Sequence, residues 1–250
     1  MMRVFLCTIA MEKNRWSTKI PSFAVSDFVE RAVKDGFDGL ELWENHLLLA
    51  DSKEQEKLYG AGIPWIYNTY LRFDQGVTSQ MREIADVITR LNPEKVKLNL
   101  SASECPVSKQ VETLLAFAGM IPDRIGLLSE CHPGTPMENP EDACRVFEML
   151  PAERFGAIVH LAPDLGENAR RFELYGNRIC HLHSQLRRPG AKERTRLDAQ
   201  PGVARDHLCA LRAWGFCGSA SIEFTQDGNT PEETYENCVA DMHMIRETLG

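Results

Sequence analysis

Short apolar runs alternate with stretches of helical periodicity along the whole chain. Ser26 and Gly36 flank the first helical stretch as an N-cap and a helix stop, and apolar residues recur within it at helical spacing. The pattern predicts eight strands, at residues 3–9, 38–43, 63–70, 95–100, 124–130, 155–160, 178–183 and 219–224. It predicts helices at residues 26–36, 52–60, 79–91, 107–120, 140–150, 166–175, 203–214 and 231–248.

Eight strand–helix units in 250 residues are typical of a (β/α)8 TIM barrel of α/β class. Short connections between alternating strands and helices favour parallel strands with right-handed crossovers. No shift in composition divides the chain, so residues 1–250 are predicted to form one domain. A doubly wound open sheet is the alternative, but no G-x-G-x-x-G motif follows the first strand to support it.

The composition indicates which class of partner and which cellular compartment to expect. A net charge of −8 argues against general nucleic-acid binding, which usually needs a basic surface. We find neither a signal peptide nor a membrane-spanning run of apolar residues. The eight cysteines are scattered without a C-x-x-C pair, which predicts reduced thiols and a cytoplasmic protein. The sequence is compatible with a homo-oligomer.

Polar side chains stand at the ends of four consecutive predicted strands. The seventh strand ends in His181 and His183, which point to the same face because strand side chains alternate. Glu130, His160 and Glu223 end the fifth, sixth and eighth strands. The chemistry of such barrels lies at the mouth formed by the C-terminal strand ends, so these groups are expected to converge there.

At these residues the chain resembles the sugar phosphate isomerase/epimerase superfamily of xylose isomerase-like TIM barrels. The resemblance covers nearly the whole chain and depends on the order and spacing of short motifs. These are D-G-L-E-L-W at 38–43, S-E-C-H-P-G-T at 129–135, H-L-H at 181–183 and I-E-F at 222–224.

The resemblance implies a divalent metal held after strands five to eight. By motif match Glu130, His183 and Glu223 take three of these positions, and His160 stands where the family usually has Asp. Two carboxylates and two imidazoles suit Mn²⁺, Zn²⁺, Co²⁺ or Fe²⁺ better than Mg²⁺ or Ca²⁺. The family's usual Asp-x-x-His motif is incomplete, because Pro163 occupies the position of its histidine.

The resemblance also implies that Glu130 and Glu223 move the proton on carbon, and that the substrate is a small sugar, sugar phosphate or sugar acid. His181 is expected behind His183 as a supporting residue. A locally basic segment, residues 185–196, follows the seventh strand and should overhang the mouth. The expected substrate contacts are His132, Asn68, Lys97, Arg188 and Trp43.

Three other functions remain open at this point. A lyase that dehydrates an inosose or a dehydroshikimate-like substrate would use the same ligands. A non-catalytic sugar-binding relative would fit the altered motif of the sixth strand. A nuclease resembling endonuclease IV would need further metal ligands after the early strands and a basic face, and neither is evident in the sequence.

Overall fold

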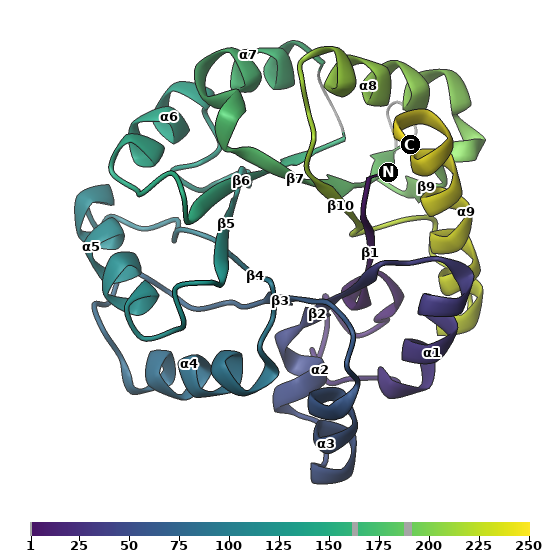
Figure 1. Cartoon of the computed structure of the whole chain (residues 1–250), viewed down its shortest axis with the longest axis horizontal. Helices are drawn as coiled ribbons and strands as arrows, with labels where there is room; N and C mark the ends of the chain where they lie inside the picture. Colours follow the sequence, from purple (N-terminus) through teal and green to yellow (C-terminus); the bar gives the residue numbers. More distant parts are fainter. Residues whose placement is uncertain (1, 162–164, 188–191) are drawn as a thin grey trace.

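The computed structural model describes residues 2–161, 165–187 and 192–250. Within these residues, eight parallel strands close into a barrel in the order β1-β10-β7-β6-β5-β4-β3-β2 (Figure 1). Pairing of β1 with both β2 and β10 closes the ring and excludes the open sheet. The barrel strands are β1 (Val4–Cys7), β2 (Gly39–Trp43), β3 (Trp65–Asn68), β4 (Lys95–Leu98), β5 (Gly126–Glu130), β6 (Phe155–His160), β7 (Ile179–Ser184) and β10 (Ser219–Ile222).

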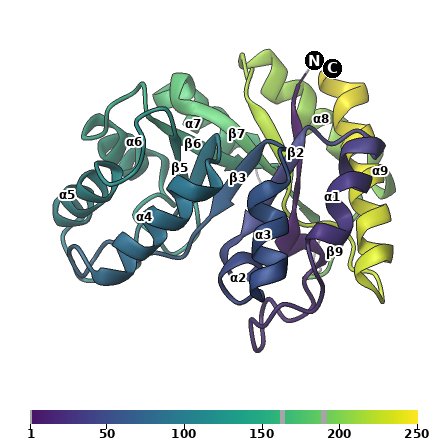
Figure 2. The ribbon, with the colours of Figure 1, turned by 60° about the horizontal axis from the view of Figure 1, so that its bottom comes forward.

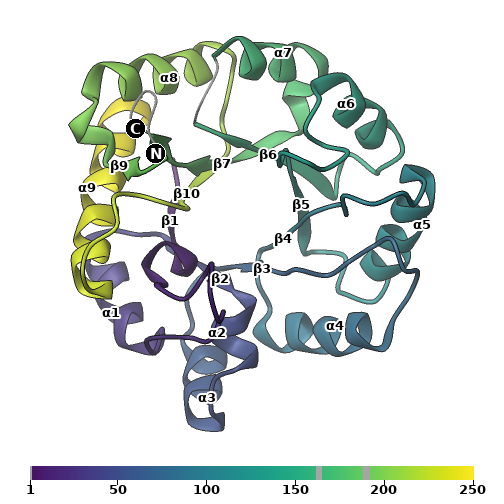
Figure 3. The same ribbon diagram turned by 180° about the vertical axis from the view of Figure 1, so that it is seen from behind.

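The helices form an outer layer around the ring, which is visible from both faces (Figures 1 and 3). Helix α9 ends close to the beginning of β1 (Figure 2). The α-helices are α1 (Ser26–Asp35), α2 (Glu44–Leu48), α3 (Ser52–Gly60), α4 (Ser79–Leu91), α5 (Val107–Ala118), α6 (Pro140–Glu148), α7 (Leu165–Tyr175), α8 (Pro201–Ala213) and α9 (Pro231–Leu249). None of the helices in the described ranges is long and apolar enough to cross a membrane.

The eight predicted strands are present, but several are shorter than predicted, such as β3, β4 and β10, and two connections also need correction. The predicted strand at 3–9 is too long, because Thr8–Met11 forms the 3-10 helix η1. Helix α2 and a hairpin of β8 (Leu186–Arg187) and β9 (Arg194–Thr195) were not predicted. Two-residue strands carry too little alternation to register as a sequence pattern.

Inside the barrel, a layer of apolar side chains lies beneath the polar groups at the mouth. Phe5, Ile66, Leu128 and Ile158 pack into one buried cluster inside the ring. Two residues further along β5 and β6, and therefore on the same face, stand Glu130 and His160. The apolar layer thus closes the floor beneath a set of buried polar groups at the mouth.

The hairpin beside the mouth is anchored to α9 through a buried carboxyl group. The 3-10 helix η3 (Leu197–Ala199) follows β9, and Leu197 N donates to Asp241 Oδ1 at 2.7 Å. Asp241 is 1% exposed. Burial raises its pKa to about 7, although bonds from Thr225 and Leu197 partly oppose the shift. The ionised form of Asp241 therefore destabilises the folded state.

This placement predicts a specific pH dependence of stability. Because the folded pKa of Asp241 exceeds its unfolded value, the contribution of Asp241 to the free energy of unfolding is greatest below about pH 4 and is lost as pH rises through 7. Asp241→Asn keeps an acceptor for Leu197 N without the charge. We expect it to raise the free energy of unfolding at pH 8 by up to about 4 kcal/mol, measured by urea denaturation. An equal gain at pH 4 and pH 8 would contradict this account.

Candidate active site

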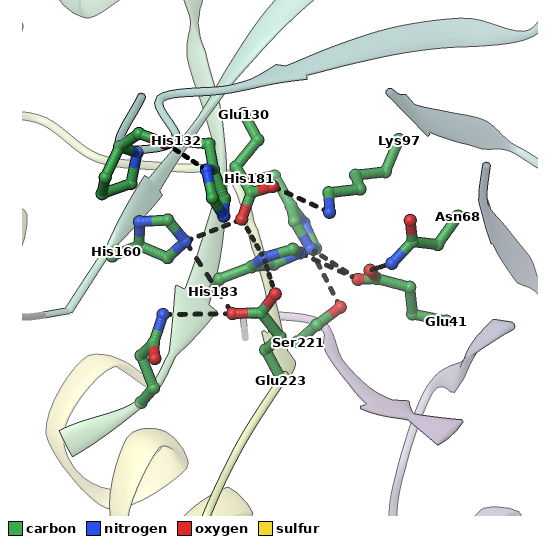
Figure 4. Close-up of polar contacts among 12 residues, drawn as sticks. Glu41, Asn68, Lys97, Glu130, His132, His160, His181, His183, Ser221 and Glu223 are labelled. Atoms are coloured by element: carbon green, nitrogen blue, oxygen red, sulfur yellow. Dashed lines mark hydrogen bonds and ion pairs between the residues drawn. The ribbon is translucent and has the colours of Figure 1, made fainter. Parts of the chain in front are cut away.

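Four side chains from adjacent strand ends meet at the barrel mouth (Figure 4). The ligand atoms of Glu130, His160, His183 and Glu223 all lie within 4.8 Å of one another. His160 Nε2 is 2.8 Å from Glu130 Oε1 and 3.8 Å from Glu223 Oε2. His183 Nδ1 is 3.5 Å from Glu130 Oε1 and 3.2 Å from Glu223 Oε1. The structure therefore brings together the four residues expected to hold a metal.

A buried ammonium group compensates part of the negative charge. Lys97, on β4, places Nζ 2.7 Å from Glu130 Oε2, and both side chains are almost fully buried. Burial alone would raise the pKa of Glu130, but Lys97 and then His160 and His183 lower it well below its usual value. Burial would likewise lower the pKa of Lys97, yet Glu130 and Glu223 raise it. Both members of the pair are therefore charged at neutral pH.

A third carboxylate fixes the orientation of the central imidazole. Glu41 Oε2, on β2, lies 3.1 Å from His183 Nε2, and Asn68 Nδ2 donates to Glu41 Oε1 at 3.4 Å. Because Glu41 accepts the proton on Nε2, the lone pair of neutral His183 is left on Nδ1. Among the described residues none gives buried Nδ1 a well-oriented hydrogen bond. This nitrogen faces Glu130 and Glu223, as a metal ligand would.

His181 lies deeper in the barrel than His183 and is fully hydrogen-bonded. Its Nδ1 and Nε2 lie 2.8 and 2.9 Å from the hydroxyls of Ser219 and Ser221. Burial lowers the pKa of His181 to about 4, so the ring is neutral at pH 7. Glu41, His181 and His183 form a second cluster of ligand-type atoms, but hydrogen bonds to one another and to the serines satisfy them. The cluster of four at the mouth is the better cation site.

The donor set and the charge both fit a divalent cation. Ligands about 2.1 Å from one metal lie roughly 3–4 Å apart, which is the range of the contacts above. Among the described residues, Lys97 is the cationic group that contacts a carboxylate of the set Glu41, Glu130 and Glu223 when the imidazoles are neutral. Burial would lower the pKa of His183, but Glu223 and Glu41 raise it well above its usual value, so an added proton partly restores the balance. A divalent metal would displace this proton and supply the missing charge.

A cavity of about 990 Å³ opens above these four residues. It is large enough for a small sugar. Of the expected substrate contacts, His132, Asn68 and Lys97 line it. Trp43 does not line the cavity, because it is fully buried in a cluster with Cys7, Ile9 and Phe224. Arg188 lies outside the described residues.

Several features of the site were not anticipated from the sequence. The roles of Lys97 and Glu41 in pairing with Glu130 and His183 depend on contacts between distant strands. Because side chains alternate along a strand, the positions of Lys97 on β4 and Glu41 on β2 could have indicated that both point into the barrel. Arg194 lines the cavity from the unpredicted hairpin; the sequence marked it only as part of the basic segment 185–196 that was expected to overhang the mouth.

Comparison with known proteins gives the fold and no closer relationship. No protein-family profile matches the chain, and no curated protein matches it. Among solved structures, the IolI protein with a bound zinc atom superposes with a TM-score of 0.69 at 14% identity, covering 99% of both chains. The probable 3-DHS dehydratase AsbF from Bacillus anthracis gives 0.67 at 15%, covering 98% of this chain and 99% of that one. D-psicose 3-epimerase from Clostridium cellulolyticum H10, with D-tagatose, gives 0.66 at 13% over 99% of both.

The chain has a (β/α)8 TIM-barrel fold, which it shares with a xylose isomerase-like TIM barrel protein from Mycobacterium smegmatis. This fold was predicted from the strand–helix alternation and the strand-end motifs, and the closed ring confirms it. Neighbours that share the fold include enzymes named as an epimerase and a probable dehydratase, so the fold alone does not decide between these reactions.

The role of Glu41 in this barrel can be tested through metal affinity. Glu41→Gln retains the size and an acceptor oxygen but removes the charge that strengthens His183 as a donor. We expect zinc affinity to fall by about 10-fold, at the lower end of the effect of such supporting residues. Competition with a chromophoric chelator would measure it. Ser221→Ala, which alters only a partner of His181, serves as the control, and wild-type affinity in Glu41→Gln would refute the role.

Proposed function

We propose that this protein is a divalent-metal-dependent isomerase or epimerase of a small sugar, sugar phosphate or sugar acid. The observation that carries the proposal is the convergence of two carboxylates and two imidazoles on one point beneath a sugar-sized cavity. The zinc in the IolI structure and the D-tagatose in the epimerase structure are consistent with this chemistry on the same fold. The proposed partner is a small molecule, and no nucleic-acid substrate is proposed.

In this proposal, Glu130, His160, His183 and Glu223 hold the metal. When bound there, a divalent metal is a Lewis acid that withdraws electrons from the substrate carbonyl and acidifies the adjacent C–H bond. Mn²⁺, Zn²⁺, Co²⁺ and Fe²⁺ all suit the mixed oxygen and nitrogen donors. Glu41 acts behind this set by fixing the orientation of His183, and His181 lies beneath it.

Glu223 and Glu130 are the proposed proton-transfer groups. Glu223 accepts the proton from the carbon next to the carbonyl, and the C–H electron pair moves toward the carbonyl oxygen. Glu130, in its protonated form, returns a proton to carbon. Solvent then reprotonates Glu130 and accepts the proton from Glu223, so no proton is gained or lost over the cycle. Lys97, whose Nζ lies 2.7 Å from Glu130 Oε2, positions the Glu130 carboxyl group. Asn68, Lys97 and His132 line the cavity where they could bind substrate hydroxyls, and Arg188 stays a sequence-based proposal.

A dehydratase is the second candidate, supported by proton donors in the same cavity. The Lys97 ammonium and the His132 imidazole both line it and could protonate a departing hydroxyl after Glu223 removes the α proton. The superposition on a probable 3-DHS dehydratase is compatible with this reaction. The two candidates share their first step and differ in whether water leaves.

Solvent exchange distinguishes the candidates and tests the two glutamates. Metal-loaded protein incubated in D₂O with ketoses and keto sugar acids is expected to yield a rearranged product that carries deuterium beside the carbonyl. Glu223→Gln and Glu130→Gln each remove a proton acceptor, so we expect the rate to fall by about 10²–10⁴-fold. Mass spectrometry would measure both the deuterium content of the product and its rate of formation. A product lighter by one water would replace the isomerase with the dehydratase.

Controls separate loss of the base from loss of the metal. Metal content is measured in each variant, because both glutamates are also proposed ligands. Glu83→Gln changes an exposed residue on α4 and should retain full activity. Chelation should abolish activity, and added Mn²⁺, Co²⁺ or Zn²⁺ should restore it. Protein that binds sugar without stoichiometric metal or exchange would instead be a non-catalytic binder.

A further inference from the structure

Two arginines project from the hairpin beside the mouth. Arg187 on β8 and Arg194 on β9 are direct cross-strand partners. Both line the cavity that also contains Glu130 and Glu223. The hairpin therefore adds positive charge to the cavity that Glu130, His160 and Glu223 of the metal-type cluster also line.

Arg194 is held in place without a carboxylate partner. Its guanidinium carbon lies 3.7 Å from the centroid of the Phe224 ring, and its Nε donates to Gln185 Oε1 at 3.4 Å. Within the described residues no carboxylate lies within 4.0 Å of this half-buried group. Arg15 and Arg171, which are also withdrawn from water, pair with Asp227 and Glu167. A partly buried charge normally needs such a partner.

Two further arginines lie near Arg194. Arg15 approaches the same Phe224 ring, with its guanidinium carbon 5.6 Å from the centroid. Burial lowers the pKa of Arg194. Glu223 and, more weakly, Asp227 raise it, whereas nearby Arg187 and Arg15 lower it. Gln200 and Val203, at the N-terminal end of α8, line this part of the cavity, so the positive end of the helix dipole adds to the field. Like charges gathered in this way favour an anion between them.

Gln185 connects this region to the proposed base. Its Oε1 accepts from Arg194 Nε, and its Nε2 donates to Glu223 Oε2 at 3.2 Å. Arg194 is thereby held one side chain away from Glu223. A substrate whose reacting carbon lies at Glu223 would extend its remaining atoms toward the guanidinium.

We infer that Arg194, together with Arg187, binds an oxyanion on the substrate at the end away from the reacting carbonyl. The planar guanidinium can donate two parallel hydrogen bonds to a carboxylate or to a phosphate. The inference rests on the proposed function, because it names the substrate class of that same site. It selects a sugar acid or a sugar phosphate over a neutral ketose.

Titration calorimetry with metal-loaded protein tests the inference without turnover. The probes are D-fructose 6-phosphate, 5-keto-D-gluconate and neutral D-fructose. We expect at least one anionic probe to bind roughly 10-fold or more tightly than D-fructose, because charge-assisted hydrogen bonds to the guanidinium strengthen its binding. The probe that binds more tightly identifies phosphate or carboxylate as the preferred group.

Variants then assign the preference to Arg194. In Arg194→Gln the preference for the anionic probe should be lost, and Arg194→Lys, which keeps the charge but not the planar fork, should retain part of it. Arg82→Gln, at an exposed position of α4, should keep the full preference. Thermal unfolding of each variant checks that it is folded.

The outcomes separate this inference from the proposed function. Equal binding of all three probes, or a preference that persists in Arg194→Gln, would overturn the anion site even if metal-dependent deuterium exchange is observed. An Arg194-dependent preference in a protein that shows no metal-dependent exchange would uphold the anion site and overturn the isomerase. Both results come from the same metal-loaded preparation.

Discussion

Three buried carboxylates at one end of a barrel impose the constraint on which this structure depends. Glu41, Glu130 and Glu223 are each 6% exposed or less, and Lys97 is the ammonium group buried among them. Charges withdrawn from water must be paired or neutralised, because their desolvation is costly. The imidazoles of His160 and His183 lie within reach of these carboxylates. The arrangement is therefore suited to hold a cation and to pass a proton between neighbouring groups.

The barrel places these charges through the alternation of strand side chains. Phe5, Ile66, Leu128 and Ile158 form an apolar layer inside the ring, and Glu130 and His160 follow on the same strand faces. The layer keeps water from the floor of the site, which strengthens the electrostatic interactions above it. Loops and the β8–β9 hairpin then shape the cavity, and Arg194 lines it from the hairpin. The strand pattern thus positions both the apolar core and the site residues, and the connections between strands shape the cavity.

The sequence predicted the features that depend on local periodicity. Alternation identified eight strands, and strand-end positions identified Glu130, His160, His183 and Glu223 as neighbours. It did not predict which interior groups pair across the ring, because the Glu41–His183 contact depends on how the strands are staggered in the closed barrel. The hairpin that carries Arg194 was missed because two-residue strands have no measurable period. Trp43 follows the expected strand parity, yet packing beneath Ile9 and Phe224 removes it from the cavity.

Anomalous diffraction from crystals soaked with Zn²⁺ or Mn²⁺ tests the central claim most directly. Data collected above and below the metal absorption edge locate the ion without reference to activity. The account predicts one strong peak bonded to Glu130, His160 Nε2, His183 Nδ1 and Glu223. The absence of a peak there, or a peak between Glu41 and His181 instead, would contradict it.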